Sequence, residues 1–128
     1  MQMLRMLRII ASTLCAFLMA VAVGPAAGAE CVVYRHAIAF NADSEVRMIV
    51  ESGKDCRVSF PLAEKTRVDS NEITAKPRYG GVRVHGTSGA YYRSNPGYRG
   101  PDLFAFSFCG ADAGKAACAD VVVKVDVR

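Results

Sequence analysis

The sequence predicts an all-β protein, an antiparallel β-sandwich of about seven or eight strands that follows a cleaved signal peptide. Beyond residue 29, no apolar set recurs at the spacing of a helix, whereas apolar and polar residues often alternate. Short apolar runs recur about every ten residues, and turn-forming residues lie between them. Both patterns are typical of a sandwich of short strands.

The first 29 residues have the pattern of a secretory signal peptide. Arg5 and Arg8 precede an uncharged apolar run, residues 9–23, which is too short to cross a bilayer comfortably. The small residues before Glu30 predict cleavage after Ala29. We therefore expect a periplasmic or secreted protein with one domain, residues 30–128, and no attachment to the membrane after cleavage.

Alternation and turn residues place the strands in order along the chain. The turn Ser52–Asp55 joins the second and third strands, which we expect to form a hairpin. Pro61 ends the third strand because it cannot donate to a ladder, and residues 62–70 form a polar connection. The expected strands are Cys31–Phe40, Glu45–Glu51, Cys56–Phe60, Asn71–Ala75, Gly81–His85, Ala90–Arg93, Leu103–Cys109 and Ala119–Val127.

The last of these strands is expected in the middle of a sheet. Five of the seven residues from Val121 to Val127 are valine. Such a nearly continuous apolar run is typical of a strand that has neighbours on both sides. Alternation places the odd-numbered valines toward the core and Asp120, Lys124 and Asp126 on the outer face.

Strand parity also predicts how four cysteines pair, since spacing alone leaves three pairings open. Cys109 and Cys118 both fall on the outer face of one hairpin, on either side of a loop over residues 110–117. Cys56 falls on an apolar face instead, which favours Cys31 as its partner. We expect the disulfides Cys31–Cys56 and Cys109–Cys118; a zinc site is the alternative, but no C-x-x-C spacing occurs.

A series of motifs runs through the C-terminal half of the chain: Ile73, Pro77 and Gly80, Val82 and Val84, Tyr92, Asn95-Pro96-Gly97-Tyr98, Gly100 and Asp102, Phe104 and Phe106, and Val121–Val127. Their order and spacing resemble those of the bacterial immunoglobulin-like, cadherin-like modules of surface and adhesion proteins. The resemblance covers about residues 71–128 and implies an Ig-like sandwich with a binding role. Some cadherin-like relatives bind calcium at Asp-rich junctions, but this sequence has no Asp-rich run, so we expect no calcium.

The stretch Asn95–Asp102 is expected to form a tight corner between two strands. Pro96 presets the backbone for a turn, and Gly97 supplies the positive φ that a type II turn requires at its third position. The ring of Tyr98 should cover the end of the sandwich, and the carboxylate of Asp102 should accept hydrogen bonds from turn amides. We therefore give a structural role to Asn95, Pro96, Gly97, Tyr98, Gly100 and Asp102.

The sequence contains no catalytic or metal-binding pattern, so we expect no enzymatic activity, metal or cofactor. His36 and His85 lie far apart without a cysteine or carboxylate at ligand spacing, and common nucleophile and metal motifs are absent. Cleavage removes Arg5 and Arg8 with the leader, so the number of Lys and Arg residues falls from 16 to 14, against 12 Asp and Glu residues. The net charge therefore falls from +4 to +2. These charges are interspersed, which argues against nucleic acid as a partner.

The best candidate for a binding surface is one hairpin in the C-terminal half. If Val82 and Val84 face the core, alternation gives its outer face four residues: Arg83, His85, Tyr91 and Arg93. Three more residues flank this face: Arg78, Tyr79 and Arg99. Arg and Tyr often anchor interfaces or stack on sugars. We therefore expect a monomeric, non-catalytic module that binds an unidentified protein or envelope polymer.

Two other functions remain open. A small periplasmic inhibitor of a hydrolase would present the loop 110–117, with Lys115, on the Cys109–Cys118 disulfide. A structural component of an envelope assembly would instead accept a partner strand at an exposed sheet edge. Substitution of Arg83, Tyr91 and Arg93 should abolish binding by the binding module, whereas substitution of Lys115 should abolish binding by the inhibitor.

Overall fold

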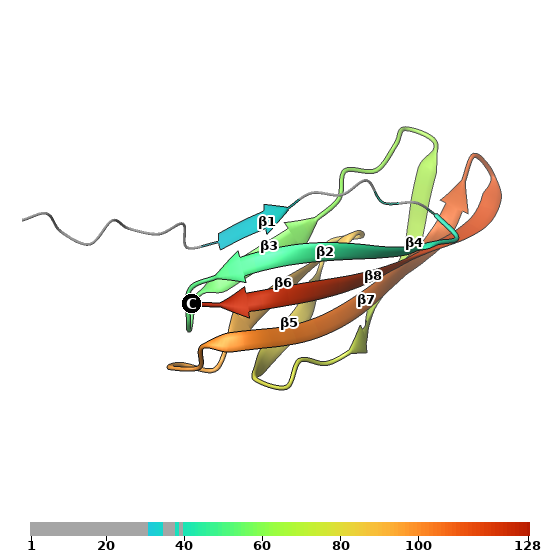
Figure 1. Ribbon diagram of the computed structural model, residues 1–128. Helices are drawn as coiled ribbons and strands as arrows, with labels where there is room; N and C mark the ends of the chain where they lie inside the picture. The colour runs from blue at the N-terminus through green and yellow to red at the C-terminus, as the bar shows by residue number, and fades with distance from the viewer. Residues whose placement is uncertain (1–30, 35–37, 39) are drawn as a thin grey trace, which may run out of the picture.

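The computed structural model describes residues 31–34, 38 and 40–128, and these residues form eight strands and no helix (Figure 1). The expected signal peptide, its cleavage site and His36 lie outside the described residues. Among the residues described, no helix is long and apolar enough to cross a membrane. The strands are β1 (Cys31–Tyr34), β2 (Asp43–Val50), β3 (Asp55–Ser59), β4 (Thr66–Ala75), β5 (Gly80–His85), β6 (Gly89–Ser94), β7 (Gly100–Asp112) and β8 (Lys115–Val127).

The strands form two sheets, which confirms the predicted all-β fold class. One sheet has five strands in the order β1-β2-β8-β7-β4, and the other has three in the order β3-β6-β5 (Figure 1). The central position predicted for the last strand is confirmed, because β8 lies between β2 and β7. The pairs are antiparallel, as predicted, except β2 with β8, which is parallel.

The core lies between the two sheets and is built from alternate residues of each strand. Phe104, Phe106 and Phe108 of β7 are at most 1% exposed, and consecutive rings lie 6.4 and 6.3 Å apart. From the smaller sheet, the ring of Tyr92 stacks on Phe104 at 5.6 Å. Each fully buried phenylalanine contributes about 2 to 3 kcal/mol through removal of its apolar surface from water. The aromatic run on β7 is therefore a main source of stability.

The expected hairpin of β2 with β3 is wrong, because these strands belong to different sheets. After Val50 the chain turns at residues 51–54 and enters the smaller sheet, where β3 pairs with β6. The end of β2 is bound to the end of β8 instead: Arg128 N–H donates to Val50 O at 2.9 Å, and Ser52 N–H donates to Arg128 O at 2.8 Å. Both β2 and β3 have an apolar face, and placement in opposite sheets buries both faces in one core.

Three strands are longer than the sequence predicts by at least four residues, and the first strand, expected to reach Phe40, ends at Tyr34. β4 begins at Thr66, inside the segment expected to be a polar connection, and β7 and β8 continue to a two-residue turn. In that turn Ala113 and Gly114 have φ values of 49° and 82°, the positive values that a tight hairpin requires. The expected loop 110–117 is therefore a continuous hairpin. The polar residues of β4 fit its place at a sheet edge, where charged side chains discourage pairing with other chains.

Two disulfide bonds are present, with the pairing that strand parity predicts. Cys31–Cys56 joins β1 of the larger sheet to β3 of the smaller sheet, and Cys109–Cys118 joins β7 to β8. The second pair lies at directly opposed positions of the β7–β8 ladder. Two disulfides indicate an oxidising environment, either extracellular or periplasmic.

Candidate functional site

The corner between β6 and β7 is a hydrogen-bonded turn. Tyr98 N–H donates to Asn95 O at 3.1 Å, and Gly97, at the third position, has a φ of 85°. These are the features of a type II turn. The ring of Tyr98 stacks on that of Tyr79 with centroids 4.2 Å apart, and its hydroxyl donates to the carbonyl of Pro101.

Asp102 joins this corner to both sheets. Its carboxylate accepts hydrogen bonds from Arg78 N–H at 3.0 Å, Tyr79 N–H at 3.1 Å and the hydroxyl of buried Tyr92 at 2.8 Å. It also accepts a bond from the amide of Leu103 at 2.9 Å. Asp102 is only 9% exposed, so its oxygens satisfy the protein's own donors and are not presented to a ligand. This geometry suits the structural role given to the corner from the sequence.

The Tyr92–Asp102 contact leads to a prediction for alkaline pH. Burial of the hydroxyl, followed by its hydrogen bond to Asp102, raises the pKa of Tyr92 above the ordinary value for tyrosine. The folded state therefore keeps a proton that the unfolded chain loses near pH 10, so this contribution to stability is fully present below about pH 10 and is lost progressively as the pH rises toward the higher pKa of the folded state. In urea unfolding between about pH 9 and 11, the parent should lose more stability than Tyr92→Phe. Equal losses in the two proteins would contradict this account.

A cluster of polar and aromatic side chains lies on the outer face of the three-stranded sheet. Tyr91, on the central strand β6, is directly opposite Arg57 on β3 and Arg83 on β5. The guanidinium carbon of Arg83 lies 4.5 Å from the centroid of the Tyr91 ring, a cation–π geometry. The ring of His85 meets the Tyr91 ring edge to face at 4.7 Å. We call the residues Arg57, Arg83, His85 and Tyr91 the outer-face cluster.

The next row of this face is electrically balanced. Arg93 forms a two-pronged ion pair with Asp55, with distances of 2.8 and 3.0 Å. Gly81 lies opposite Arg93 and has no side chain, and a shallow hollow of about 710 Å³ opens there beside Arg83. Because Asp55 neutralises Arg93, the excess positive charge of the face lies on Arg57 and Arg83.

The structure brings together four of the seven residues predicted to bind a ligand: Arg83, His85, Tyr91 and Arg93. Arg78 and Tyr79 line a different groove, of about 620 Å³, together with Leu103 and Lys124 of the larger sheet. Arg99 is exposed and lies between the β6–β7 turn and β7.

Two residues of this face were missed by the sequence analysis, Arg57 and Asp55. They were missed because β3 was assigned to a hairpin with β2, whereas it pairs with β6. The alternation along β3 already indicated their position. Cys56 and Val58 point into the core, so Asp55 and Arg57 point outward.

The core position expected for Val84 is also wrong, because its side chain is 42% exposed. β5 forms the edge of the smaller sheet, and the inner face of an edge strand is only partly covered.

Within the described part of the chain, no three His, Cys, Asp or Glu side chains gather in a way that could hold a metal ion. The site thus consists of cationic, aromatic and hydrogen-bonding groups on an exposed sheet face. No known family model matches this chain, and no curated protein shows significant similarity to it.

Proposed function

We propose that the protein is a non-catalytic binding module that recognises anionic groups of a protein or envelope polymer through the outer-face cluster. The observation that carries this proposal is the row Arg57–Tyr91–Arg83, in which an aromatic ring lies between two arginines from neighbouring strands. Guanidinium groups bind carboxylates and phosphates through paired hydrogen bonds, and tyrosine adds a flat apolar surface. A rigid sheet holds these groups at fixed spacing.

The compartment and the type of module are part of the same proposal. The N-terminal charge and hydropathy pattern supports export through a signal peptide, and the two disulfides support a periplasmic or secreted location. The motif series over residues 71–128 and the two-sheet fold support an immunoglobulin-like, cadherin-like type. The module acts as a monomer, without a metal, a cofactor or nucleic acid.

The two other functions have less support. The inhibitor hypothesis relied on a long loop, but only Ala113 and Gly114 separate β7 from β8, and Lys115 lies in the ladder. The assembly hypothesis relies on a sheet edge, but the edge strand β4 carries exposed charged side chains that discourage pairing, and the edge strand β5 is only six residues long. Binding through the outer-face cluster is the better supported of the three.

Loss of the two unbalanced arginines should weaken binding to anionic polymers. The probes are immobilised poly-L-glutamate and dextran sulfate, with neutral dextran as a blank. We expect Arg57→Gln/Arg83→Gln to lower the affinity at least tenfold, about 1.4 kcal/mol, because two charged contacts are lost. Surface plasmon resonance at fixed ionic strength provides the measurement, since salt screens such contacts.

The matched control removes the same net charge from the other sheet. Arg47 and Arg67 lie on β2 and β4 and are exposed, so Arg47→Gln/Arg67→Gln makes the same chemical change away from the cluster. This control should bind within about twofold of the parent. If the two double variants lose affinity equally, binding reflects overall charge and the proposed site is wrong.

A further inference from the structure

A second site lies at the end of the molecule where the two sheets differ in length. β7 and β8 have 13 residues each, whereas β3, β5 and β6 have five or six. The larger sheet therefore extends beyond the smaller one, and Figure 1 shows β4 and the β7–β8 hairpin reaching past it. The inner face of this extension is covered by connecting segments, among them residues 60–65 between β3 and β4.

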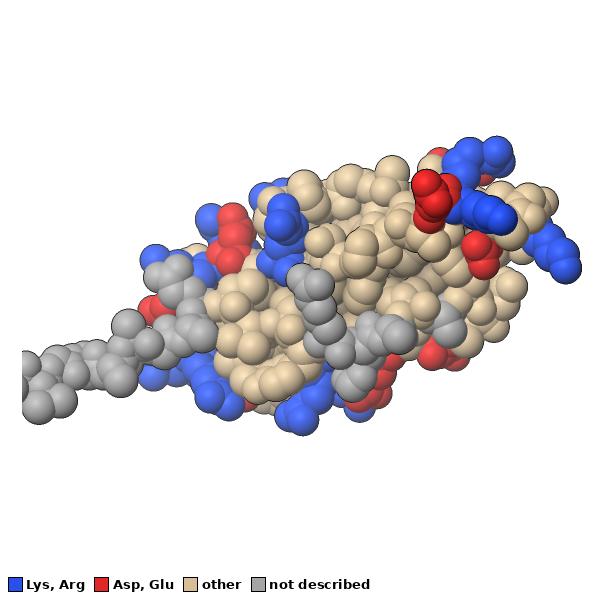
Figure 2. Space-filling view, turned by 90° about the horizontal axis from the view of Figure 1, so that it is seen from above, with Lys and Arg blue, Asp and Glu red and all other residues tan. Residues whose placement is uncertain are grey.

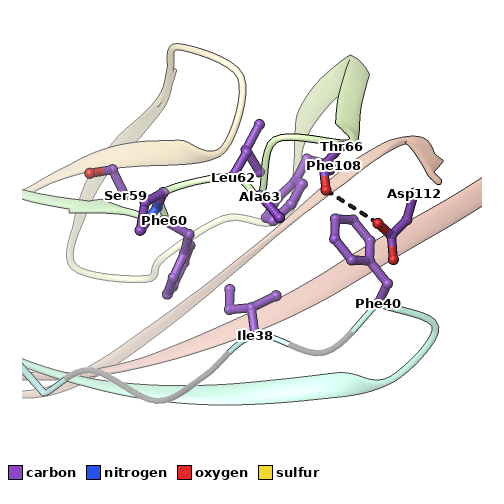
Figure 3. A pocket seen from close by; sticks show the side chains of 10 residues that line it. Ile38, Phe40, Ser59, Phe60, Leu62, Ala63, Thr66, Phe108 and Asp112 are labelled. Atoms are coloured by element: carbon purple, nitrogen blue, oxygen red, sulfur yellow. Dashed lines mark hydrogen bonds between the residues drawn. The ribbon is translucent and has the colours of Figure 1, made fainter.

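These connections leave a cavity of about 480 Å³ above the extended sheet. Figure 3 shows Ile38 and Phe40 on one side of it and Phe60, Leu62 and Ala63 on the other. This volume is typical of pockets that hold small molecules. Figure 2 shows the whole molecule from above, with uncharged surface in the middle and charged side chains toward both ends.

The aromatic walls of the cavity are held in place by the core. Phe40 meets Phe108 edge to face with centroids 6.1 Å apart, and Phe60 stacks on buried Phe106 at 6.4 Å. Phe108 itself is 1% exposed. The rings thus form part of a preformed surface, so a ligand would not have to order them on binding.

Among the described residues that line the cavity, Asp112 is the charged one. Figure 3 shows it beside Thr66 at one end, where the Thr66 hydroxyl donates to Asp112 Oδ1 at 3.3 Å. Lys115 faces Asp112 across the hairpin, yet the ion pairs found among the described residues do not include Asp112. The exposed carboxylate of Asp112 therefore has acceptor capacity left for a ligand at the end of an aromatic cavity.

We propose that this cavity binds a small aromatic amine. The aromatic ring of the ligand occupies the space between Ile38, Phe60 and Leu62, where apolar surface is removed from water. Its ammonium group lies at the other end, donates a hydrogen bond to Asp112 and contacts the face of the Phe40 ring. An anionic compound of similar size binds more weakly, because Asp112 repels it.

The test compares three probes that share a phenylethyl group and differ in their end group, in NMR titrations of the disulfide-bonded protein: 2-phenylethylamine, 2-phenylethanol and 3-phenylpropionate. We expect the amine to bind at least threefold more tightly than the alcohol, and the acid to bind most weakly. Asp112→Asn should remove the preference for the amine, because the carboxamide has no charge. The proposal is overturned if no probe gives saturable shifts at millimolar concentration, or if the acid binds as tightly as the amine.

A second pair of variants tests the location of the site. Ala63→Phe places a ring at the cavity and should lower amine affinity at least tenfold, with the melting temperature unchanged or raised. Ala116→Phe makes the same change on the outer face of β8, at the same end of the protein, and should leave affinity unchanged. Unchanged binding by a folded Ala63→Phe variant would show that the amine binds elsewhere.

Discussion

Replacement of Asp102 with alanine is expected to lower the free energy of unfolding by about 3 to 5 kcal/mol, because three donors from other parts of the chain lose their acceptor. The amides of Arg78 and Tyr79 and the hydroxyl of Tyr92 all donate to this carboxylate. Asp102→Asn keeps the size and one acceptor oxygen, so its loss should be about half as large. Urea unfolding followed by circular dichroism measures both losses.

A double-mutant cycle with Tyr92→Phe isolates one of these bonds. Without the hydroxyl of Tyr92, the cost of Asp102→Ala should fall by about 1 to 2 kcal/mol, because one donor is no longer left without a partner. A total loss for Asp102→Ala below about 1 kcal/mol would mean that other acceptors replace the carboxylate, and the role assigned to this residue would be wrong.

Removal of the two disulfides should have unequal effects, with the larger loss for Cys31–Cys56. The bonded cysteines are 25 residues apart in one case and 9 in the other. The chain-entropy model gives losses of about 3.5 kcal/mol for the longer closure and about 2.6 kcal/mol for the shorter one. Paired Cys→Ala variants, compared by urea unfolding, measure this difference.

The structure adds a local reason for the same order. Cys31–Cys56 is the covalent link between the sheets, and it fixes β1, an edge strand of only four residues. Cys109–Cys118 joins two strands that are already paired over 13 positions. A greater loss on removal of Cys109–Cys118 would show that the closed loop length does not control the effect.

Features that depend on neighbouring residues were predictable from the sequence. Alternation has a period of two, so it identified all eight strands and the inward face of β8. The same local parity was enough to pair the cysteines correctly, because residues on opposite faces of a sheet cannot be bridged. The corner at Asn95–Asp102 was predictable because Pro and Gly specify its turn directly.

Features that depend on distant residues were not predictable in this way. Alternation does not say which strand is the neighbour, and Asp55 pairs with Arg93, 38 residues further along the chain. One of the two arginines of the outer-face row, Arg57, was therefore missed. The start of β4 was missed for a related reason: residues 66–70 are mainly polar, and only the pairing with β7 shows that they form a strand.

The place of β8 in the larger sheet has a consequence for how the protein is made. β1 and β2 lie on one side of β8, and β7 and β4 lie on the other, so β8 is the strand that joins them. Protein synthesis usually allows N-terminal parts to fold first. In this protein, β2 lacks its parallel partner until residues 120–127 have been made. The larger sheet therefore cannot be completed before residues 120–127 have been made, because its two halves meet only through β8.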